Sequence, residues 1–189
     1  MKECLIFICK RLITANPEVV FAYTNGKLDI CEIIMRKRDF VIAVAIPIFV
    51  GVLASLLTKE GMMAFAVLEK PPLTPPGWLF PIVWTILYAM MGIASYLITV
   101  SGADSMKVDE ALLFYGIQLL TNFMWPIFFF GFGWYFAALL ILAALWLFIF
   151  HTIQLFLPIS KTAAYLMIPY LVWVTFAGYL NLGVWLLNR

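Results

Sequence analysis

The chain has 189 residues, 65% of them hydrophobic and only 12% charged, and its formal net charge is +2. A soluble domain has about 45–50% apolar and about 25% charged residues, so this composition excludes an ordinary soluble protein. The small net charge predicts no nucleic-acid partner, and with His151 as the single histidine we expect no metal site.

Residues 1–34 differ from everything that follows. They mix charged and apolar residues without a sustained period, and they hold all three cysteines, Cys4, Cys9 and Cys31. Their first apolar run is shorter than the core of a signal peptide, which has about 7–15 residues. We interpret 1–34 as a weakly structured leader or an over-extended gene start before Met35, with an amphipathic surface segment as the alternative.

Five later segments are long and apolar enough to cross a bilayer, which takes about 20 residues in a helix. They cover about residues 40–58, 78–100, 111–130, 134–157 and 162–187. Lipid offers no hydrogen bonds to bare backbone, so such apolar runs are expected to be helical. The predicted fold class is an all-α membrane protein, a five-transmembrane-helix bundle within residues 35–189.

Basic residues flank the predicted spans unequally. One side would carry Arg36, Lys37, Arg38, Lys107 and Lys161, and the other Lys59, Lys70 and Arg189. The positive-inside rule therefore favours a cytoplasmic N-terminus. We expect an integral, multi-pass protein in the cell membrane of a bacterium.

The connection between the first two spans is rich in proline, with four prolines in the six positions from Pro71 to Pro76. Proline fixes its own backbone angle and restricts the residue before it, so this loop is expected to be extended and stiff. A plain connector is one interpretation, and a lid over the mouth of the bundle is the other.

The third span carries polar side chains near its middle. Gln118 and Asn122 are four residues apart, and Trp125 follows three residues later, so all three share one helix face. Because amides facing lipid are costly, this face is expected to look inward. The spacing fits a structural contact between helices as well as it fits a ligand contact.

The second and fifth spans carry aromatic residues at helical spacing. Trp84 and Tyr88 form such a pair in the second span. The fifth span contains Trp173, Phe176, Ala177 and Leu180. A small alanine one turn from a tryptophan leaves a notch beside a flat aromatic wall, although aromatic residues in membrane helices most often serve packing alone.

Together these motifs resemble the TspO/MBR family, the translocator proteins, also called tryptophan-rich sensory proteins or peripheral benzodiazepine receptors. The resemblance is carried by L-x-K-P-x-x-x-P-P at 68–76, F-P-I-V-W at 80–84, L-Y at 87–88, Q-L-x-x-N-x-x-W at 118–125 and P-Y-x-x-W-x-x-F-A-x-x-L-N at 169–181. The matches keep their order and extend over roughly residues 40–188.

The resemblance implies a five-helix fold, a homodimer, and a pocket for tetrapyrroles and for synthetic isoquinoline or benzodiazepine ligands. By motif, the pocket would be lined by Trp84, Asn122, Trp125, Trp173, Ala177 and Leu180, with Tyr88 and Phe176 beside them. Some bacterial members are reported to degrade protoporphyrin in light, which implicates Trp84 and Trp173 as the catalytic pair if this chain is an enzyme.

Three positions depart from the family pattern. Ala64 and Phe65 stand where a Trp-Tyr pair is common, and Leu73 stands where an aromatic residue is frequent. These changes predict a lid with fewer aromatic rings. A sterol-contact pattern from Tyr179 also fails, because the next cation, Arg189, is too far along the chain. Sterol binding of the mammalian kind is not expected.

The primary hypothesis is a membrane receptor or sensor that binds a protoporphyrin-type or haem-type tetrapyrrole as ligand, with no cofactor required. A light-dependent porphyrin-degrading enzyme is the first alternative. No carboxylate lies in a predicted span, which excludes paired-carboxylate chemistry in the membrane but leaves photochemistry open. A tetrapyrrole transporter is the second alternative, although the two halves show no internal repeat of the kind common in transporters.

Overall fold

The computed structural model describes residues 27–189, with side chains from residue 37 onward except at 64 and 66. The chain divides after Ile42, and the helical bundle is the unit Ala43–Arg189. In the described residues five helices are long and apolar enough to cross a membrane, which confirms the predicted fold class. Most of the predicted leader lies outside the described residues.

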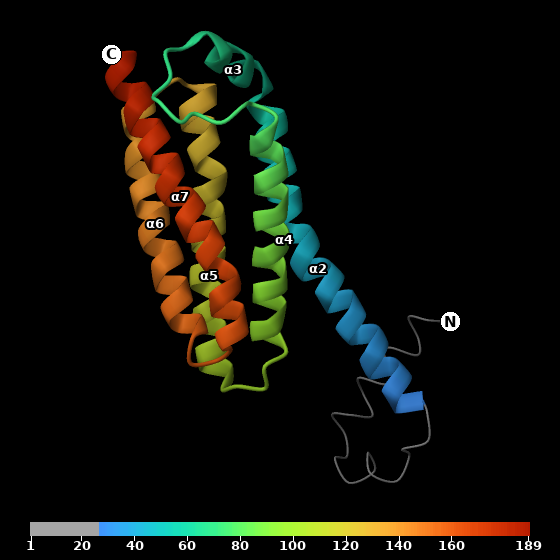
Figure 1. Cartoon of the computed structure of the whole chain (residues 1–189). Helices are drawn as coiled ribbons and strands as arrows, with labels where there is room; N and C mark the ends of the chain where they lie inside the picture. Colours follow the sequence, from blue (N-terminus) through green and yellow to red (C-terminus); the bar gives the residue numbers. More distant parts are fainter. Residues whose placement is uncertain (1–26) are drawn as a thin grey trace. The chain divides into compact units, whose positions relative to one another are not determined.

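The long helices follow the predicted spans closely. They are α2 (Lys27–Leu57), α4 (Leu79–Thr99), α5 (Ser105–Pro126), α6 (Tyr135–Phe156) and α7 (Lys161–Leu187), and a short π-helix, η3 (Ile127–Gly131), extends α5 (Figure 1). Two helices begin earlier than predicted. Helix α2 begins at Lys27 rather than at about 40, so its first turns take in the end of the predicted leader. Helix α5 begins at Ser105 because Asp104 caps it, accepting a 3.0 Å hydrogen bond from the backbone N–H of Met106.

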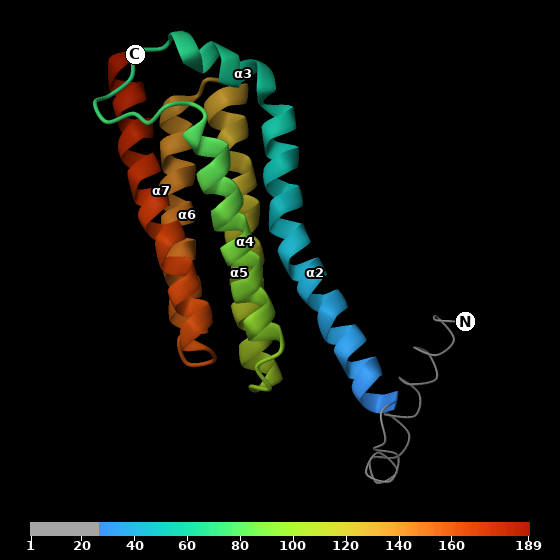
Figure 2. The ribbon, with the colours of Figure 1, turned by 45° about the vertical axis from the view of Figure 1, so that its right-hand side comes forward.

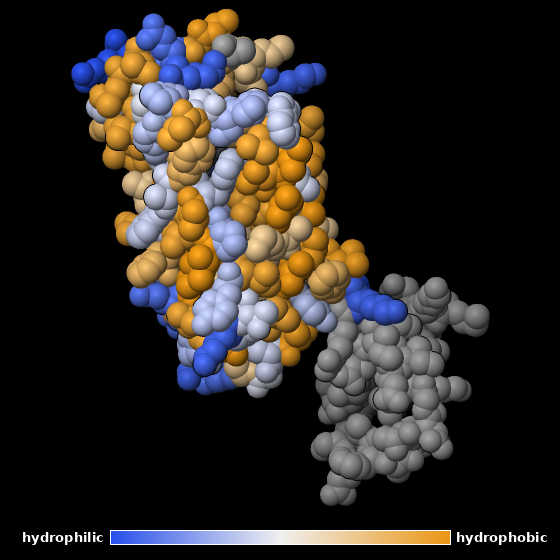
Figure 3. All heavy atoms as spheres, in the orientation of Figure 1, coloured by the Kyte–Doolittle hydropathy of each residue, from blue (hydrophilic) through white to orange (hydrophobic). Residues whose placement is uncertain are grey.

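Helix α6 packs along both α5 and α7, and α4 packs along α7 and α5. The faces that meet are lined by fully buried apolar side chains such as Met91, Leu142 and Ile149. Large apolar side chains also cover the outside, among them Leu113, Leu147 and Val172. In Figure 3 strongly hydrophilic residues gather towards the two ends of the bundle, and the middle shows hydrophobic residues together with residues of near-neutral hydropathy. This is the surface expected of a bundle surrounded by lipid.

From Ala43 onward, α2 approaches α4 through glycines on both helices. A methyl group at Gly92 of α4 would lie 2.5 Å from the Cα of Val44. A methyl group at Gly51 of α2 would collide with the ring of Tyr88. Small residues at these contacts let the two backbones come close, as in other membrane helix pairs.

Residues 59–78, here called the lid segment, cross one end of the bundle (Figure 2). The segment contains two short helices, α3 (Lys59–Ala64) and η2 (Phe65–Val67), before its proline-rich loop. The side-chain amide of Asn188 accepts from the Glu69 N–H at 3.1 Å and donates to the Glu69 carbonyl at 2.9 Å. The Tyr179 hydroxyl donates to the Pro72 carbonyl at 2.8 Å. The lid segment is therefore fastened to the C-terminal end of α7.

Candidate ligand-binding site

An interhelical cavity of about 560 Å³ lies between α2, α4, α5 and α7, beneath the lid segment. Its α2 wall comes from the last turns of that helix, and its roof includes Phe65, Lys70 and Thr74 of the lid segment. Its volume lies within the range of about 300–1,000 Å³ typical of small-molecule sites.

Trp84 of α4 is the centre of the aromatic wall of this cavity. Its ring lies 5.5 Å from that of Tyr88 and 6.3 Å from that of Trp125, at interplanar angles of 30° and 31°. The ring of Tyr170, from α7, meets it edge-on at 6.2 Å. The rings of Tyr88 and Trp125 are thus each tilted by about 30° from that of Trp84, and the three rings supply apolar aromatic surface to the wall, which suits an aromatic ligand.

Asn122 of α5 joins three helices at the inner end of the cavity. Its side-chain oxygen accepts a 2.6 Å hydrogen bond from the Tyr88 hydroxyl, and its side-chain nitrogen donates to the Tyr170 hydroxyl at 2.9 Å. Asn122 is 2% exposed, so the amide needs these partners. Asn122 ties α4 and α7 to α5, which is the structural contact foreseen for it, and because it also lines the cavity its contact with a ligand stays a prediction.

A second polar contact fixes Trp125. Its indole N–H donates to the side-chain oxygen of Asn181 at 3.0 Å, and the Asn181 nitrogen donates to the backbone carbonyl of Tyr135 at 2.8 Å. The three residues come from α5, α7 and α6. Asn181 is 1% exposed and lines the cavity together with Trp125, so this contact fixes the orientation of the indole ring.

Six of the eight residues predicted to bind ligand line the interhelical cavity. They are Trp84, Tyr88, Asn122, Trp125, Ala177 and Leu180. The other two, Trp173 and Phe176, do not border it. Trp173 packs instead edge-on against Phe80 at 6.0 Å and against Phe176 at 5.6 Å.

Trp173 and Phe176 lie outside the cavity lining for a geometric reason, and their contact with a ligand stays a prediction. On α7 the cavity is bordered by Ala177, Leu180, Asn181 and Val184, which form one stripe towards the lid end. Trp173 lies one turn before this stripe, and Phe80 of α4 borders the cavity where Trp173 was expected. The buried indole nitrogen of Trp173 has no hydrogen-bond partner among the described residues.

Sequence reasoning also missed several residues that line the cavity. Phe65 and Lys70 come from the lid segment, and Phe129 and Phe130 come from η3. The L-x-K-P motif was a signal for Lys70. Phe65, at a position where the aromatic content of the lid was expected to fall, still supplies a ring to the wall. Leu73, the other departure, is 81% exposed and lies outside the cavity.

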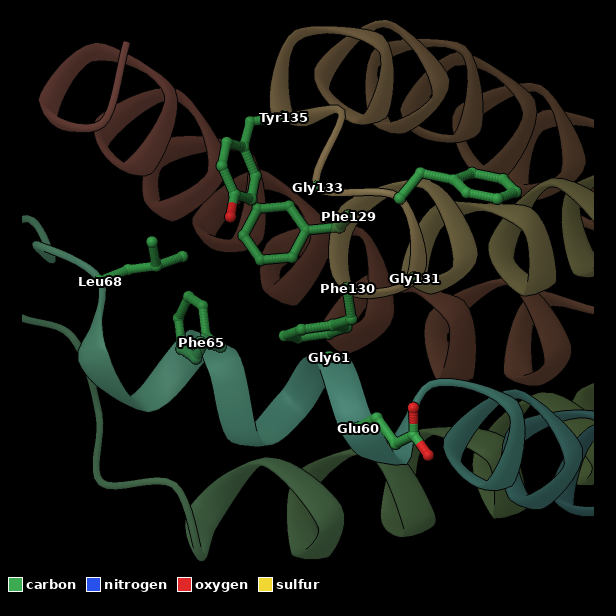
Figure 4. A pocket seen from close by; sticks show the side chains of 10 residues that line it. Glu60, Gly61, Phe65, Leu68, Phe129, Phe130, Gly131, Gly133 and Tyr135 are labelled. Carbon is green, nitrogen blue, oxygen red and sulfur yellow. The ribbon is translucent and has the colours of Figure 1, made fainter.

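A smaller pocket of about 360 Å³ lies beside the cavity at the same end of the bundle and is called the lid pocket (Figure 4). Phe65, Phe129 and Phe130 border both spaces, with ring centres 4.8–5.7 Å apart. Gly61 allows this arrangement, because a side chain there would collide with the carbonyl of Phe130. Three phenylalanine rings therefore separate the cavity from the lid pocket.

The groups around the interhelical cavity suit binding better than acid–base chemistry. The lining contains aromatic and aliphatic side chains, two amides, several hydroxyls and the ammonium of Lys70, and no carboxylate or imidazole among the described residues. In that same part of the chain no group of three or more His, Cys, Asp or Glu residues could hold a metal ion. Orientation and burial of an apolar molecule are what such a lining provides.

A model described as the TspO/MBR family matches residues 43–186 of the chain. The chain belongs to the TspO/MBR family. The match includes α2 from Ala43, the lid segment and the four helices that follow it, so it contains every element that lines the cavity. The resemblance inferred from short motifs is thereby confirmed.

Individual relatives agree with the TspO/MBR assignment. The tryptophan-rich protein TspO of Chlorobaculum tepidum is 39% identical over 157 residues, 82% of this chain and 99% of that protein. The translocator protein of Bos taurus is 37% identical over 149 residues, 76% of this chain and 86% of that protein. The tryptophan-rich sensory protein of Cereibacter sphaeroides is 37% identical over 121 residues, 64% of this chain and 74% of that protein.

In this TspO/MBR member the family motifs have distinct places. The L-x-K-P and Pro-Pro pairs form the loop of the lid segment, and the N-x-x-W motif of α5 faces the cavity. The A-x-x-L-N motif of α7 lines another wall of the cavity. A multi-pass membrane protein with a site for a small apolar ligand is therefore the description that the family and the fold support together.

Proposed function

We propose that this protein is a membrane receptor or sensor that binds a porphyrin-type tetrapyrrole in the interhelical cavity. One observation carries the proposal: the indoles of Trp84 and Trp125 lie at 31° to each other on the wall of a cavity of about 560 Å³. A porphyrin is a large, flat, mostly apolar ring, and aromatic side chains on a cavity wall are the surfaces on which such a ring packs.

The sensory part of the proposal has support from one relative. The protein of Cereibacter sphaeroides is named a tryptophan-rich sensory protein. In this chain the lid segment lines one end of the cavity and is fastened to α7 through Asn188 and Tyr179. Ligand that fills the cavity touches both the lid segment and four helices, so a change in occupancy can be transmitted to the membrane surface.

Light-dependent porphyrin degradation is a second candidate, because oxidisable indoles line the cavity. The tryptophans assigned to this candidate activity differ from the pair Trp84 and Trp173 that the sequence suggested. Trp84 and Trp125 border the cavity, whereas Trp173 lies behind Phe80. An electron-transfer partner for bound, excited porphyrin is therefore Trp84 or Trp125 in this scheme.

The remaining expectations accompany the proposal as predictions. They are a homodimer, binding of isoquinoline or benzodiazepine-type ligands, and a bacterial cell membrane with the N-terminus in the cytoplasm. The dimer would be detected by crosslinking in native membranes. The orientation would be detected by labelling a single cysteine introduced at Ser105 or at Arg189 in a variant whose three own cysteines are replaced by serine.

The proposal is tested by titrating the purified full-length protein in lipid nanodiscs with protoporphyrin IX in the dark. We expect saturable quenching of tryptophan fluorescence together with a shift of the porphyrin absorption band. Quenching that rises linearly with porphyrin, as in empty nanodiscs, would overturn the proposal. Absorbance under illumination then separates the two candidates, since a defined product that requires protein supports the enzyme and simple quenching supports the receptor.

A further inference from the structure

Part of the lining of the interhelical cavity is also exposed on the outside of the bundle. Among the described residues of the long helices, those that combine both properties belong to α2 and α4: Val52, Ser55, Leu56, Pro81 and Thr85. The cavity residues that α5, η3 and α7 supply are all buried or half-buried. The cavity therefore reaches the outer surface of the bundle between α2 and α4, at these five residues, which are called the side opening.

The side opening begins where the close contact between α2 and α4 ends. A methyl group at Gly92 of α4 would lie 2.5 Å from the backbone of α2, and one at Gly51 of α2 would collide with the ring of Tyr88. The two helices therefore touch at both of these levels. One turn further towards the lid segment on each helix, Ser55 and Thr85 are exposed. The two helices thus no longer seal the cavity at its lid end.

Helix α2 is the more loosely held of the two helices beside the side opening. Between Ala43 and Leu57 only Pro47 and Ala54 are buried, whereas seven residues of α4 are buried. An element with few buried apolar contacts is displaced at low cost in free energy. A displacement of α2 would therefore widen the side opening and leave the packed core of the other helices in place.

The lid segment, which is the other way into the cavity, is held more firmly. The side-chain amide of Asn188 makes two hydrogen bonds with the backbone of Glu69, at 3.1 and 2.9 Å, and the Tyr179 hydroxyl donates to another backbone carbonyl of the segment at 2.8 Å. Pro71 is buried, and a methyl group at Gly183 of α7 would lie 2.5 Å from it. Opening the lid segment would break all of these contacts.

The side opening faces lipid. It lies within two segments that are long and apolar enough to cross a membrane, Lys37–Leu57 and Leu79–Thr99. The exposed residues beside it are also apolar, among them Leu53, Leu57, Ile82 and Ile86. The side opening contains no charged residue, and the Thr85 hydroxyl donates to the Pro81 carbonyl at 2.7 Å. An apolar molecule dissolved in the bilayer would therefore pass from one apolar environment into another, without crossing water.

We propose that the ligand enters and leaves the interhelical cavity from the lipid bilayer, through the side opening between α2 and α4. This inference rests on the proposed function and adds the source of the ligand, because a protein with such an entrance samples molecules dissolved in the membrane. The lid segment then serves as a fixed roof, and a displacement of α2 admits the ring of the ligand.

The test measures rates as well as affinity, with the full-length protein in nanodiscs and protoporphyrin IX in the dark. Stopped-flow quenching of tryptophan fluorescence gives the association rate, and transfer of bound porphyrin to excess empty nanodiscs gives the dissociation rate. Ser55→Phe/Thr85→Phe narrows the side opening. The matched control, Leu57→Phe/Ile86→Phe, adds rings at exposed positions of the same helices that do not line the cavity. Leu56→Ala, at an exposed position of the side opening, widens it.

We expect Ser55→Phe/Thr85→Phe to slow both association and dissociation by about fivefold to tenfold, since the route is obstructed in both directions. Because the two rates change together, the Kd should stay within about twofold of the wild-type value. Leu56→Ala should speed both rates by about twofold, and the control should change neither. Asn188→Ala/Tyr179→Phe, which loosens the lid segment, should leave both rates unchanged.

Each contrary result has a separate meaning. Unchanged rates in Ser55→Phe/Thr85→Phe would overturn this inference while leaving porphyrin binding in place. Faster dissociation alone would show that the side opening is a binding wall and no route, which overturns it too. Faster association and dissociation in Asn188→Ala/Tyr179→Phe would place the route under the lid segment and overturn it as well.

Failure of the wild type to bind porphyrin would overturn the proposed function and this inference with it. Size-exclusion chromatography and circular dichroism confirm that each variant is folded. If the double phenylalanine variant does not fold, Leu56→Ala decides, because unchanged or slower rates in that variant contradict a route through the side opening.

Discussion

Gln118 and Asn122 occupy successive turns on the same inward face of α5, yet only Asn122 has hydrogen-bond partners among the described side chains. The amide of Asn122 is bonded to Tyr88 and Tyr170, whereas both polar atoms of the fully buried Gln118 amide lack a partner there. Two amides that the sequence could not distinguish therefore differ in what they contribute to stability.

Asn122→Leu should lower the free energy of unfolding by about 1–3 kcal/mol, because it leaves two buried tyrosine hydroxyls without their partner. Unfolding by SDS titration in mixed micelles measures this change. The control is the same substitution in a Tyr88→Phe/Tyr170→Phe background, where the loss should be much smaller. Equal losses in both backgrounds would mean that Asn122 stabilises through packing alone.

Gln118→Leu should have the opposite sign and raise the free energy of unfolding by about 1–2 kcal/mol, since it removes an unpaired amide from the bundle interior. Leucine is close in size, so the packing around the site is kept. The same SDS titration compares it directly with Asn122→Leu. A loss of stability would reveal a hydrogen-bonding partner for Gln118 in the membrane-embedded protein.

Ala177→Leu should raise the Kd for protoporphyrin IX by at least about tenfold, or about 1.4 kcal/mol, because Ala177 lines the cavity and the larger side chain projects into it. Stability should fall little, since the added carbons enter open space. Ala143→Leu, at an exposed position of α6, is the matched control and should leave the Kd unchanged. Wild-type affinity in folded Ala177→Leu would place the ligand elsewhere.

Trp84→Phe should weaken dark binding of protoporphyrin IX by about 0.5–1.5 kcal/mol through lost ring contact, and Trp125→Phe should act in the same direction. Trp173→Phe should change binding less than either, because Trp173 does not border the cavity. If bound porphyrin decays in light, Trp84→Phe or Trp125→Phe should slow the decay and Trp173→Phe should not. Slower decay in Trp173→Phe alone would contradict the assignment drawn from the cavity.

Gly92→Ala should destabilise the bundle, because the new methyl group would lie 2.5 Å from the Cα of Val44 and force α2 away from α4. Thermal unfolding in detergent measures the effect. Gly116→Ala is a natural control, since nothing lies within 4 Å of the added carbon and the position is helical and exposed. It should stabilise the protein by about 0.5–1 kcal/mol. Similar effects of both substitutions would exclude a close contact at Gly92.

The sequence by itself determined the class of protein and the places of its helices. In an apolar segment that crosses a bilayer, only a helix satisfies the hydrogen bonds of the backbone. Most ends of the spans could therefore be predicted to within a few residues. Six cavity residues could also be named, because motifs on α4, α5 and α7 placed them on shared helix faces.

Only the tertiary structure decided which of these helix faces meet, and which residues of neighbouring helices lie side by side along the bundle. Helical spacing assigns Trp173 to a face, but the antiparallel packing of α7 on α4 puts Phe80 between it and the cavity. The partners of Asn122 lie 34 and 48 residues away in the chain, beyond the reach of any local pattern. Lys70 lines the cavity because contacts at Asn188 and Tyr179 hold the lid segment across the bundle. Local periodicity predicts where a helix forms, whereas long-range packing determines which helices lie beside it.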